Sequence, residues 1–288
     1  MSERWAVIVH GGAKTIPEAR RERHRQGCLR AVEAGAEVLR SGGSAVDAVE
    51  AAVRALEDDP TFNAGRGSVT NADGEVECDA AIMDGSDLSV GGVAAVRTLR
   101  HPISVACSML PERPVLLVAD GAERFARDHG AEFCAPEDLI APHDDDPGCD
   151  TVGCVALDVS GDIAAGTSTG GLRDCAPGRV GDSPLPGCGL YADSAIGGVS
   201  LSGEGESIIR TTLAARLIQA LETDTPGPAI DHALAVLERV GGEAGLIVID
   251  HRGRVDWGHN SDHFAVAHAS RDEPARAFLQ RSEDRRKT

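Results

Sequence analysis

The stretch PGCDTVGCVALDVSGDIAAGTSTGG, residues 147–171, decides how the rest of the chain is interpreted. Its two apolar runs, 152–159 and 163–167, predict short strands, and the S-G-D turn between them predicts a hairpin. An acidic segment rich in Pro and Gly, HDDDPG, comes directly before it. Thr151 therefore lies at the open end of a predicted hairpin, just after a segment of the kind that is readily cut.

This position matters because a Thr hydroxyl is a poor nucleophile unless a base lies beside it. A free α-amine on the same residue is one of the few groups that can act as that base. If the Asp150–Thr151 bond were broken, Thr151 would carry an amine with a pKa of roughly 7.7 to 8.0, close to working pH. A Thr at the start of a strand is also an ordinary β-branched strand former, so the hairpin alone leaves a purely structural role open.

Composition excludes several classes of partner. The 288 residues include 46 acidic and 28 basic side chains, a net charge of −18, which argues against nucleic acid or an anionic membrane. No apolar run approaches the ~20 residues of a membrane helix, and the first residues lack the features of a secretory signal. The eight cysteines form no C-x-x-C pair and no zinc-ligand spacing, so free thiols are expected. We expect a cytoplasmic protein with no membrane or nucleic-acid partner.

Helical and strand patterns alternate along the chain. Strands at both ends, with helix pairs after each strand group, predict an α/β protein in which layered sheets lie between helices, an αββα arrangement. One domain is expected over 1–270, with a flexible linker at 132–148 and a polar tail at 271–288. The other expected elements are a strand at 5–10, helices at 17–40 and from Ser44 to Leu56, a hairpin of 68–69 with 76–83, single helices at 204–221 and 229–240, and a meander of 246–250, 255–258 and 264–268.

Several motifs resemble one known family. DTVGCVALD, GTSTGG, PGRVGDSPLPGCGLYAD and LSGEGESIIR follow one another between 150 and 210. VIVHGGA, FNAGRGSV and CDAAIMDG precede them, and GGEAGLIVID follows. In this order they resemble the N-terminal-nucleophile hydrolases of the plant-type L-asparaginase and isoaspartyl peptidase family, over nearly all of residues 5–268. The resemblance implies the four-layer fold of that family and a precursor that cleaves itself between Asp150 and Thr151 into chains 1–150 and 151–288.

The resemblance also implies roles for residues around Thr151, the catalytic nucleophile. Thr169 matches the second hydroxyl that faces it, and Ser202 with Gly203 matches the Thr-Gly pair that forms the oxyanion hole. Asn63 matches an amide that hydrogen-bonds the Thr151 amine. Each has an ordinary alternative, since Thr169 and Asn63 could be turn residues and Ser202 could cap the following helix.

Arg179 and Asp182, in P-G-R-V-G-D, could be solvated loop charges. A guanidinium fork and a carboxylate three residues apart also suit an amino-acid zwitterion, because the first binds an α-carboxylate and the second an α-ammonium group. The resemblance assigns them, with Gly203, to substrate binding. A substrate with a free α-amino acid head would then be selected.

Three further features bear on the resemblance. Lys14 follows the Gly11-Gly12 loop at a position where Gly is commoner, and Cys149 stands where His commonly precedes the cleavage site. The backbone from Leu56 to Ser68 matches a loop that binds sodium in some members. No other metal or cofactor is expected.

We therefore predict a self-cleaving hydrolase that acts on the side-chain amide of L-asparagine and on β-aspartyl (isoaspartyl) dipeptides. The family implies a dimer of cleaved precursors, an (αβ)2 heterotetramer. A glycosylasparaginase, or a catalytically silent relative that binds amino acids, remains the alternative. A dinucleotide-binding protein is disfavoured because the Gly motifs HGGAK and SGEGES lack the full fingerprint.

Overall fold

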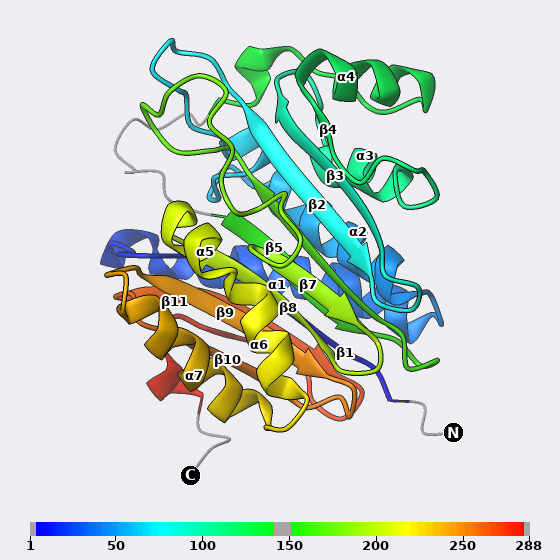
Figure 1. Ribbon diagram of the computed structural model, residues 1–288, viewed down its shortest axis with the longest axis vertical. Helices are drawn as coiled ribbons and strands as arrows, with labels where there is room; N and C mark the ends of the chain where they lie inside the picture. Colours follow the sequence, from blue (N-terminus) through cyan, green and yellow to red (C-terminus); the bar gives the residue numbers. More distant parts are fainter. Residues whose placement is uncertain (1–3, 141–150, 285–288) are drawn as a thin grey trace.

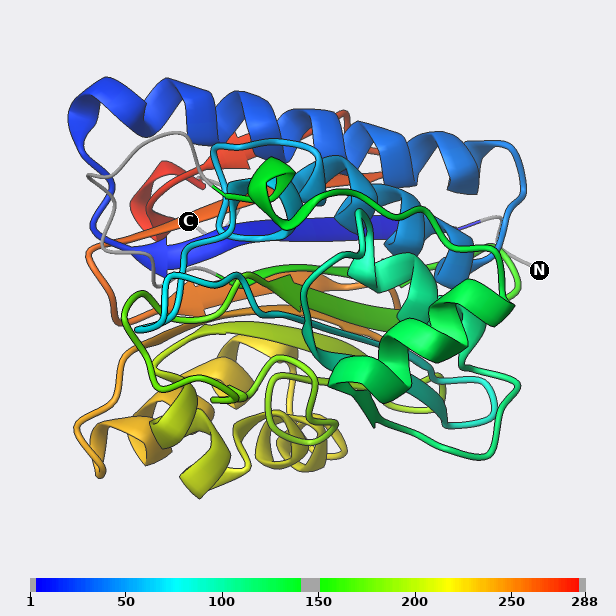
Figure 2. The ribbon, with the colours of Figure 1, turned by 90° about the horizontal axis from the view of Figure 1, so that it is seen from above.

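The computed structural model describes residues 4–140 and 151–284, so Cys149 and Asp150 lie outside the described residues. Two β-sheets face each other between two layers of helices, which confirms the predicted αββα arrangement (Figures 1 and 2). The larger sheet has the order β12 (Arg276–Phe278), β11 (His263–Ser270), β1 (Ala6–Lys14), β5 (Thr151–Leu157), β6 (Ile163–Thr169), β2 (Cys78–Asp84), β3 (Ser89–Val96), β4 (Leu117–Val118). The smaller sheet has the order β10 (Val255–His259), β9 (Ala244–Asp250), β8 (Gly197–Gly203), β7 (Leu190–Asp193).

Helices cover the outer face of each sheet. α1 (Glu18–Arg40) and α2 (Ala45–Glu57) pack on the larger sheet, and α3 (Pro102–Ser108) with α4 (Ala119–Asp128) covers its β2–β4 end (Figure 2). Ser44 and Asp47 form a capping box at the start of α2, in which the Asp47 N–H donates to Ser44 Oγ at 3.1 Å. Short 3-10 turns occur at η1 (Gly65–Gly67), η2 (Pro136–Asp138) and η3 (Arg281–Glu283).

Three apolar clusters fill the spaces between the layers. The first lies between α1, α2 and the larger sheet, the second between the two sheets, and the third between the smaller sheet and its helices. They consist mainly of Ala, Val, Leu and Ile, as a chain with only 3% aromatic residues requires. No helix of the described residues is long and apolar enough to cross a bilayer.

The helices on the smaller sheet differ from the expectation of one long helix over 204–221. The structure has α5 (Gly205–Thr211) and α6 (Leu213–Leu221), followed by α7 (Pro226–Glu238). Thr212 interrupts the helix because it adopts a left-handed conformation with φ of 47°. The Thr211 Oγ1 hydroxyl donates back to the Ser207 carbonyl at 2.8 Å, an alternative to regular helical bonding that the apolar pattern does not reveal.

Two strand pairings also differ from expectation. β9 and β10 form a hairpin, but β11 leaves their sheet and pairs with β1, so the last three strands are not a meander. Likewise the turn at Asn71 forms, yet β2 pairs with β3 and β6 rather than with residues 68–69. Since β11 is buried along nearly its whole length, it fits between two strands of the larger sheet.

The expected linker and tail are partly incorrect. Residues 132–140 pack against the domain, because Leu139 is fully buried and its carbonyl accepts from the Ser68 N–H at 2.9 Å. The rest of the linker, 141–148, lies outside the described residues. In the tail, β12 extends the larger sheet and Phe278 and Leu279 are buried, so the domain continues to at least residue 284.

Candidate active site

The predicted central hairpin is confirmed, and its register brings two hydroxyl groups together. β5 and β6 pair along their full length with Thr151 directly opposite Thr169 at the open end. Opposed residues of an antiparallel pair lie about 5 Å apart, so the side chains of these two threonines are neighbours. Both are largely buried, at 7% and 6% exposure, and both line the same cavity.

The backbone nitrogen of Thr151 is held by the residue expected in the oxyanion hole. Ser202 Oγ, at the end of β8, accepts hydrogen bonds from the Thr151 N–H at 3.2 Å and the Ala13 N–H at 3.1 Å. Ser202 Oγ therefore contacts the nitrogen that would become the α-amine after cleavage. Stabilisation of an oxyanion by Ser202 and Gly203 stays a prediction, and Gly203 lines the cavity beside them.

The hydroxyl of Thr151 has a partner that the sequence analysis missed. Ser183 Oγ lies 2.9 Å from Thr151 Oγ1, and either oxygen can donate. The Ser183 carbonyl in turn accepts from Thr167 Oγ1 at 2.6 Å, so Ser183 is tied to β6. Its place in the motif P-G-R-V-G-D-S-P, next to Asp182, was the only sequence signal for it.

The cavity has a volume of about 450 Å³ and lies between the hairpin and the two predicted substrate-binding charges, Arg179 and Asp182, here called the clamp. Thr151 and Thr169 lie on its wall with Arg179 and Asp182. Asp182 and Ser183 are only 3% and 1% exposed, so the alternative that Asp182 is a solvated loop charge does not hold. The structure therefore gathers a nucleophile candidate and both charges of the clamp around one space.

The two charged groups of the clamp have different environments. Burial raises the pKa of Asp182 to about 7, and its Oδ2 atom has no hydrogen-bond partner among the described residues. Arg179 instead forms a bidentate ion pair with Glu206, from Nε to Oε1 at 3.0 Å and from Nη2 to Oε2 at 2.8 Å. A buried carboxyl oxygen that accepts no hydrogen bond suits an incoming ammonium group.

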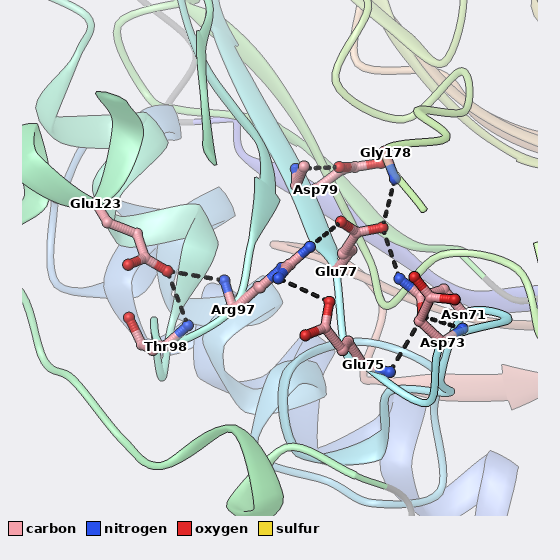
Figure 3. A network of polar contacts seen from close by, with 10 residues as sticks. Asn71, Asp73, Glu75, Glu77, Asp79, Arg97, Thr98, Glu123 and Gly178 are labelled. Carbon is pink, nitrogen blue, oxygen red and sulfur yellow. Dashed lines mark hydrogen bonds and ion pairs between the residues drawn. The ribbon is translucent and has the colours of Figure 1, made fainter. Parts of the chain in front are cut away.

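Side chains from β2 and its flank anchor the loop that carries the clamp (Figure 3). The Gly178 N–H, next to Arg179, donates to Glu77 Oε2 at 2.8 Å. Glu77 also accepts from Asn71 at 3.0 Å and from Arg97 at 2.8 Å. Burial alone would raise the pKa of Glu77, but these three bonds hold it below its usual value.

Asn63 has a different neighbourhood from the one expected. Its Nδ2 donates to the Gly171 carbonyl at 2.7 Å, and its Oδ1 accepts from the Val69 N–H at 3.0 Å. These contacts fix the turn that follows Thr169. A hydrogen bond from Asn63 to the Thr151 amine stays a prediction.

The loop from Leu56 to Ser68 is the expected sodium-binding segment. The loop turns tightly, and both the N–H and the hydroxyl of Ser68 donate to the Gly65 carbonyl. Burial raises the pKa of Glu57, at the base of the loop, to about 8, and Glu57 Oε2 has no partner in the described part of the chain. A cation in this loop would take its ligands from backbone carbonyl oxygens, and it stays a prediction. No group of three or more His, Cys, Asp or Glu residues that could hold a metal occurs within 4–140 and 151–284.

Comparison with known proteins agrees with this arrangement. A family model described as asparaginase matches residues 3–145 and 134–278. The chain belongs to this asparaginase family. Three relatives named isoaspartyl peptidase/L-asparaginase come from Macaca fascicularis, Homo sapiens and Danio rerio. The first two are 46% identical over 87% of this chain and 88% of their own length, and the third is 45% identical over 86% of each.

The expected membership of this family is thus confirmed. The matches span the hairpin, the loop over residues 171–189 and both sheets, so they concern the whole domain rather than one motif. The chain is accordingly an enzyme of the family.

Proposed function

We propose that this protein hydrolyses the side-chain amide of L-asparagine and of β-aspartyl dipeptides, with Thr151 as its nucleophile. One observation supports the proposal: the paired threonines Thr151 and Thr169 line the same cavity as Arg179 and Asp182. The names of the relatives support this substrate class. A cavity of about 450 Å³ lies within the usual range for small-molecule sites, roughly 300 to 1,000 Å³.

The first step is self-cleavage of the precursor. Thr151 Oγ1 attacks the carbonyl carbon of Asp150, and its proton passes to the Thr151 nitrogen as the Asp150–Thr151 C–N bond breaks. The acyl group thereby moves from nitrogen to oxygen as an ester. Water then hydrolyses the ester, which releases the Asp150 carboxylate and leaves Thr151 with a free amine. Ser183 Oγ at the hydroxyl and Ser202 Oγ at the nitrogen support this step, because they fix both reacting atoms of Thr151.

The free amine then acts as the base for substrate hydrolysis. It accepts the proton of Thr151 Oγ1 as this oxygen attacks the side-chain carbonyl carbon of the substrate. The tetrahedral intermediate expels ammonia or an amino acid, which takes up the proton, and a β-aspartyl ester on Thr151 remains. Water, deprotonated by the same amine, hydrolyses the ester to aspartate. Ser202 and Gly203 are the groups we assign to stabilise the oxyanion.

The clamp places the substrate for this attack. Arg179 binds the α-carboxylate and Asp182 the α-ammonium group, so the β-carbonyl points toward Thr151. Because Asp182 is buried, its partner must be a small free ammonium group rather than a peptide nitrogen within a chain. Substrates with an N-terminal β-aspartyl residue are therefore expected.

A comparison of three substrates with two proteins tests the proposal. The purified protein should release ammonia from L-asparagine and leucine from β-aspartyl-leucine, whereas Thr151→Ala should do neither. Faster release of a glycosylamine from glycosyl-asparagine would instead favour a glycosylasparaginase. No turnover of any of the three, with a single intact chain on a denaturing gel, would indicate a silent relative and overturn the proposal.

We further propose that two cleaved precursors form a dimer, as the resemblance implies, and that light scattering of the cleaved protein gives twice the mass of one precursor. A monomer would refute this. We also propose a cytoplasmic location, which the seven free cysteines of the described residues support because disulfides are rare there. Fractionation of cells that produce the protein tests the location.

The Leu56–Ser68 loop is proposed to hold a sodium ion through backbone carbonyl oxygens. Such an ion would stabilise the loop that carries Asn63. Thermal melting in sodium chloride and in choline chloride at equal ionic strength tests this, with a higher melting temperature in sodium expected. Equal melting temperatures would exclude the ion.

A further inference from the structure

The ion pair between Arg179 and Glu206 uses only one edge of the guanidinium group. Glu206 binds Nε and Nη2, the side edge, at 3.0 and 2.8 Å. A guanidinium group has five N–H donors, and its end edge, formed by Nη1 and Nη2, can bind a second carboxylate in the same bidentate manner. The contact with Glu206 therefore leaves one fork of the Arg179 side chain for a ligand.

Two glycines surround the same guanidinium group at very short distance. A Cβ atom on Gly181 would lie 2.9 Å from Arg179 Nη1, and one on Gly205 would lie 2.8 Å from Nη2. Both values are shorter than ordinary contacts, so any larger residue would displace the Arg179 side chain. Together with Glu206, these glycines form a closely fitted cradle.

We propose that Glu206 is a positioning residue that fixes Arg179 with its end edge toward the substrate α-carboxylate. This inference rests on the proposed function, since it concerns the same clamp. A free Arg side chain samples many rotamers, and an ion pair along one edge restricts it to those that present the other edge. Glu206 lies in the first turn of α5, so the helix fixes its backbone.

Burial agrees with this division of roles. Both side chains line the cavity, but the Arg179 side chain is 20% exposed and the Glu206 side chain is 57% exposed. Glu206 is thus the more solvent-exposed member of the ion pair. If Glu206 instead competed with the substrate carboxylate for Arg179, replacing Glu206 would lower KM.

The test compares Glu206→Gln with the matched control Glu243→Gln. Glu243 lies beside the same cavity and its removal changes the charge equally, but no contact with Arg179 is present among the described residues. For L-asparagine, Glu206→Gln should raise KM about tenfold with kcat within about twofold, since only binding geometry is lost. Glu243→Gln should change KM by less than about twofold. Glu206→Asp, which keeps the charge on a shorter side chain, should give an intermediate KM.

A substrate without the α-carboxylate separates positioning from general damage. L-Asparaginamide retains the α-ammonium group and the side-chain amide, so Glu206→Gln should change its kcat/KM by less than about twofold relative to the unaltered protein. Calorimetric titration with L-aspartate, which needs no turnover, should show the same loss of affinity as KM. A lower KM for L-asparagine in Glu206→Gln, or equal losses for both substrates, would overturn the inference. Failure of the unaltered protein to cleave L-asparagine would instead refute the proposed function.

Discussion

The two sides of the cavity are built from different interactions. On one side, the hairpin of β5 and β6 places Thr151 through seven consecutive strand pairs. On the other side, the loop over residues 171–189, here called the clamp loop, belongs to no strand, and carboxylates of other elements hold it in place. The nucleophile is thus positioned by backbone register, whereas the clamp loop is held by a hydrogen bond to Glu77 and an ion pair with Glu206.

This difference predicts how each side responds to change. Substitutions in the hairpin should lower stability and affect chemistry, because the strands form the centre of the larger sheet. Substitutions of the clamp charges Arg179 and Asp182 should change substrate affinity and its pH dependence with little loss of stability. The following predictions test this distinction, beginning with the largest expected effect.

Removal of the clamp cation should affect binding most. Arg179→Ala deletes both forks of the guanidinium group, and we expect KM for L-asparagine to rise about a hundredfold or more, as for the loss of other charged hydrogen-bonded pairs. The melting temperature should stay within about 2 °C, because the partner Glu206 is exposed and solvates readily. Steady-state kinetics and calorimetry measure the two quantities. An unchanged KM would show that another residue binds the α-carboxylate.

A methyl group at Gly153 should damage the hairpin side instead. A Cβ atom there would lie 2.0 Å from Ser200 Oγ and 2.5 Å from His10 Nε2, two buried groups behind β5. We expect Gly153→Ala to lower the free energy of unfolding by about 2 kcal/mol or more, the usual cost of overpacking. Denaturant titration measures it, with Gly121→Ala as the control, since no atom lies within 4 Å of the added Cβ in α4. Equal stability of the two variants would contradict the role given to the close packing behind Thr151.

The pH dependence of binding should report Asp182. Burial raises its pKa to about 7, so the carboxylate that binds the substrate ammonium group becomes protonated as the pH falls through 7. At pH 6 about a tenth of the free enzyme would be ionised, and KM should be about tenfold above its value at pH 8. Glu206 does not produce this effect, because its ion pair with Arg179 lowers its pKa.

Proton release offers an independent check of the same group. Binding of L-aspartate near pH 6.5 should release a proton, measurable by calorimetry in two buffers of different ionisation enthalpy. Asp182→Asn should abolish the release. A KM that stays constant between pH 6 and 8 would refute the assignment of Asp182 to the ammonium group.

The smallest effect is expected at Ser183, which touches the nucleophile from the clamp loop. Ser183→Ala removes one hydrogen bond to Thr151 Oγ1, worth about 1 kcal/mol, and should lower kcat and the rate of self-cleavage about fivefold. KM should not change, because Ser183 contacts neither charge of the clamp through the bonds observed here. An increase in KM without a change in kcat would place Ser183 with the substrate instead.

The sequence predicted the hairpin side better than the clamp side for a physical reason. The two apolar runs on either side of the S-G-D turn define the pairing of β5 and β6 locally, and the capping box at Ser44 is equally local. The contacts of Ser183 and Glu206 depend on how distant segments pack, which no short pattern encodes. The same holds for β11, whose apolar pattern suits either sheet, and for Thr212, whose left-handed conformation divides the expected helix.

The central claim is that Thr151 acquires its catalytic base when the chain ahead of it is cut. Intact mass measurement with N-terminal sequencing of the purified, active protein tests this most directly. We predict two chains that correspond to residues 1–150 and 151–288, the second beginning with Thr151, and no cleavage in Thr151→Ala. An uncut chain that hydrolyses L-asparagine, or an active second chain that begins at another residue, would contradict the account.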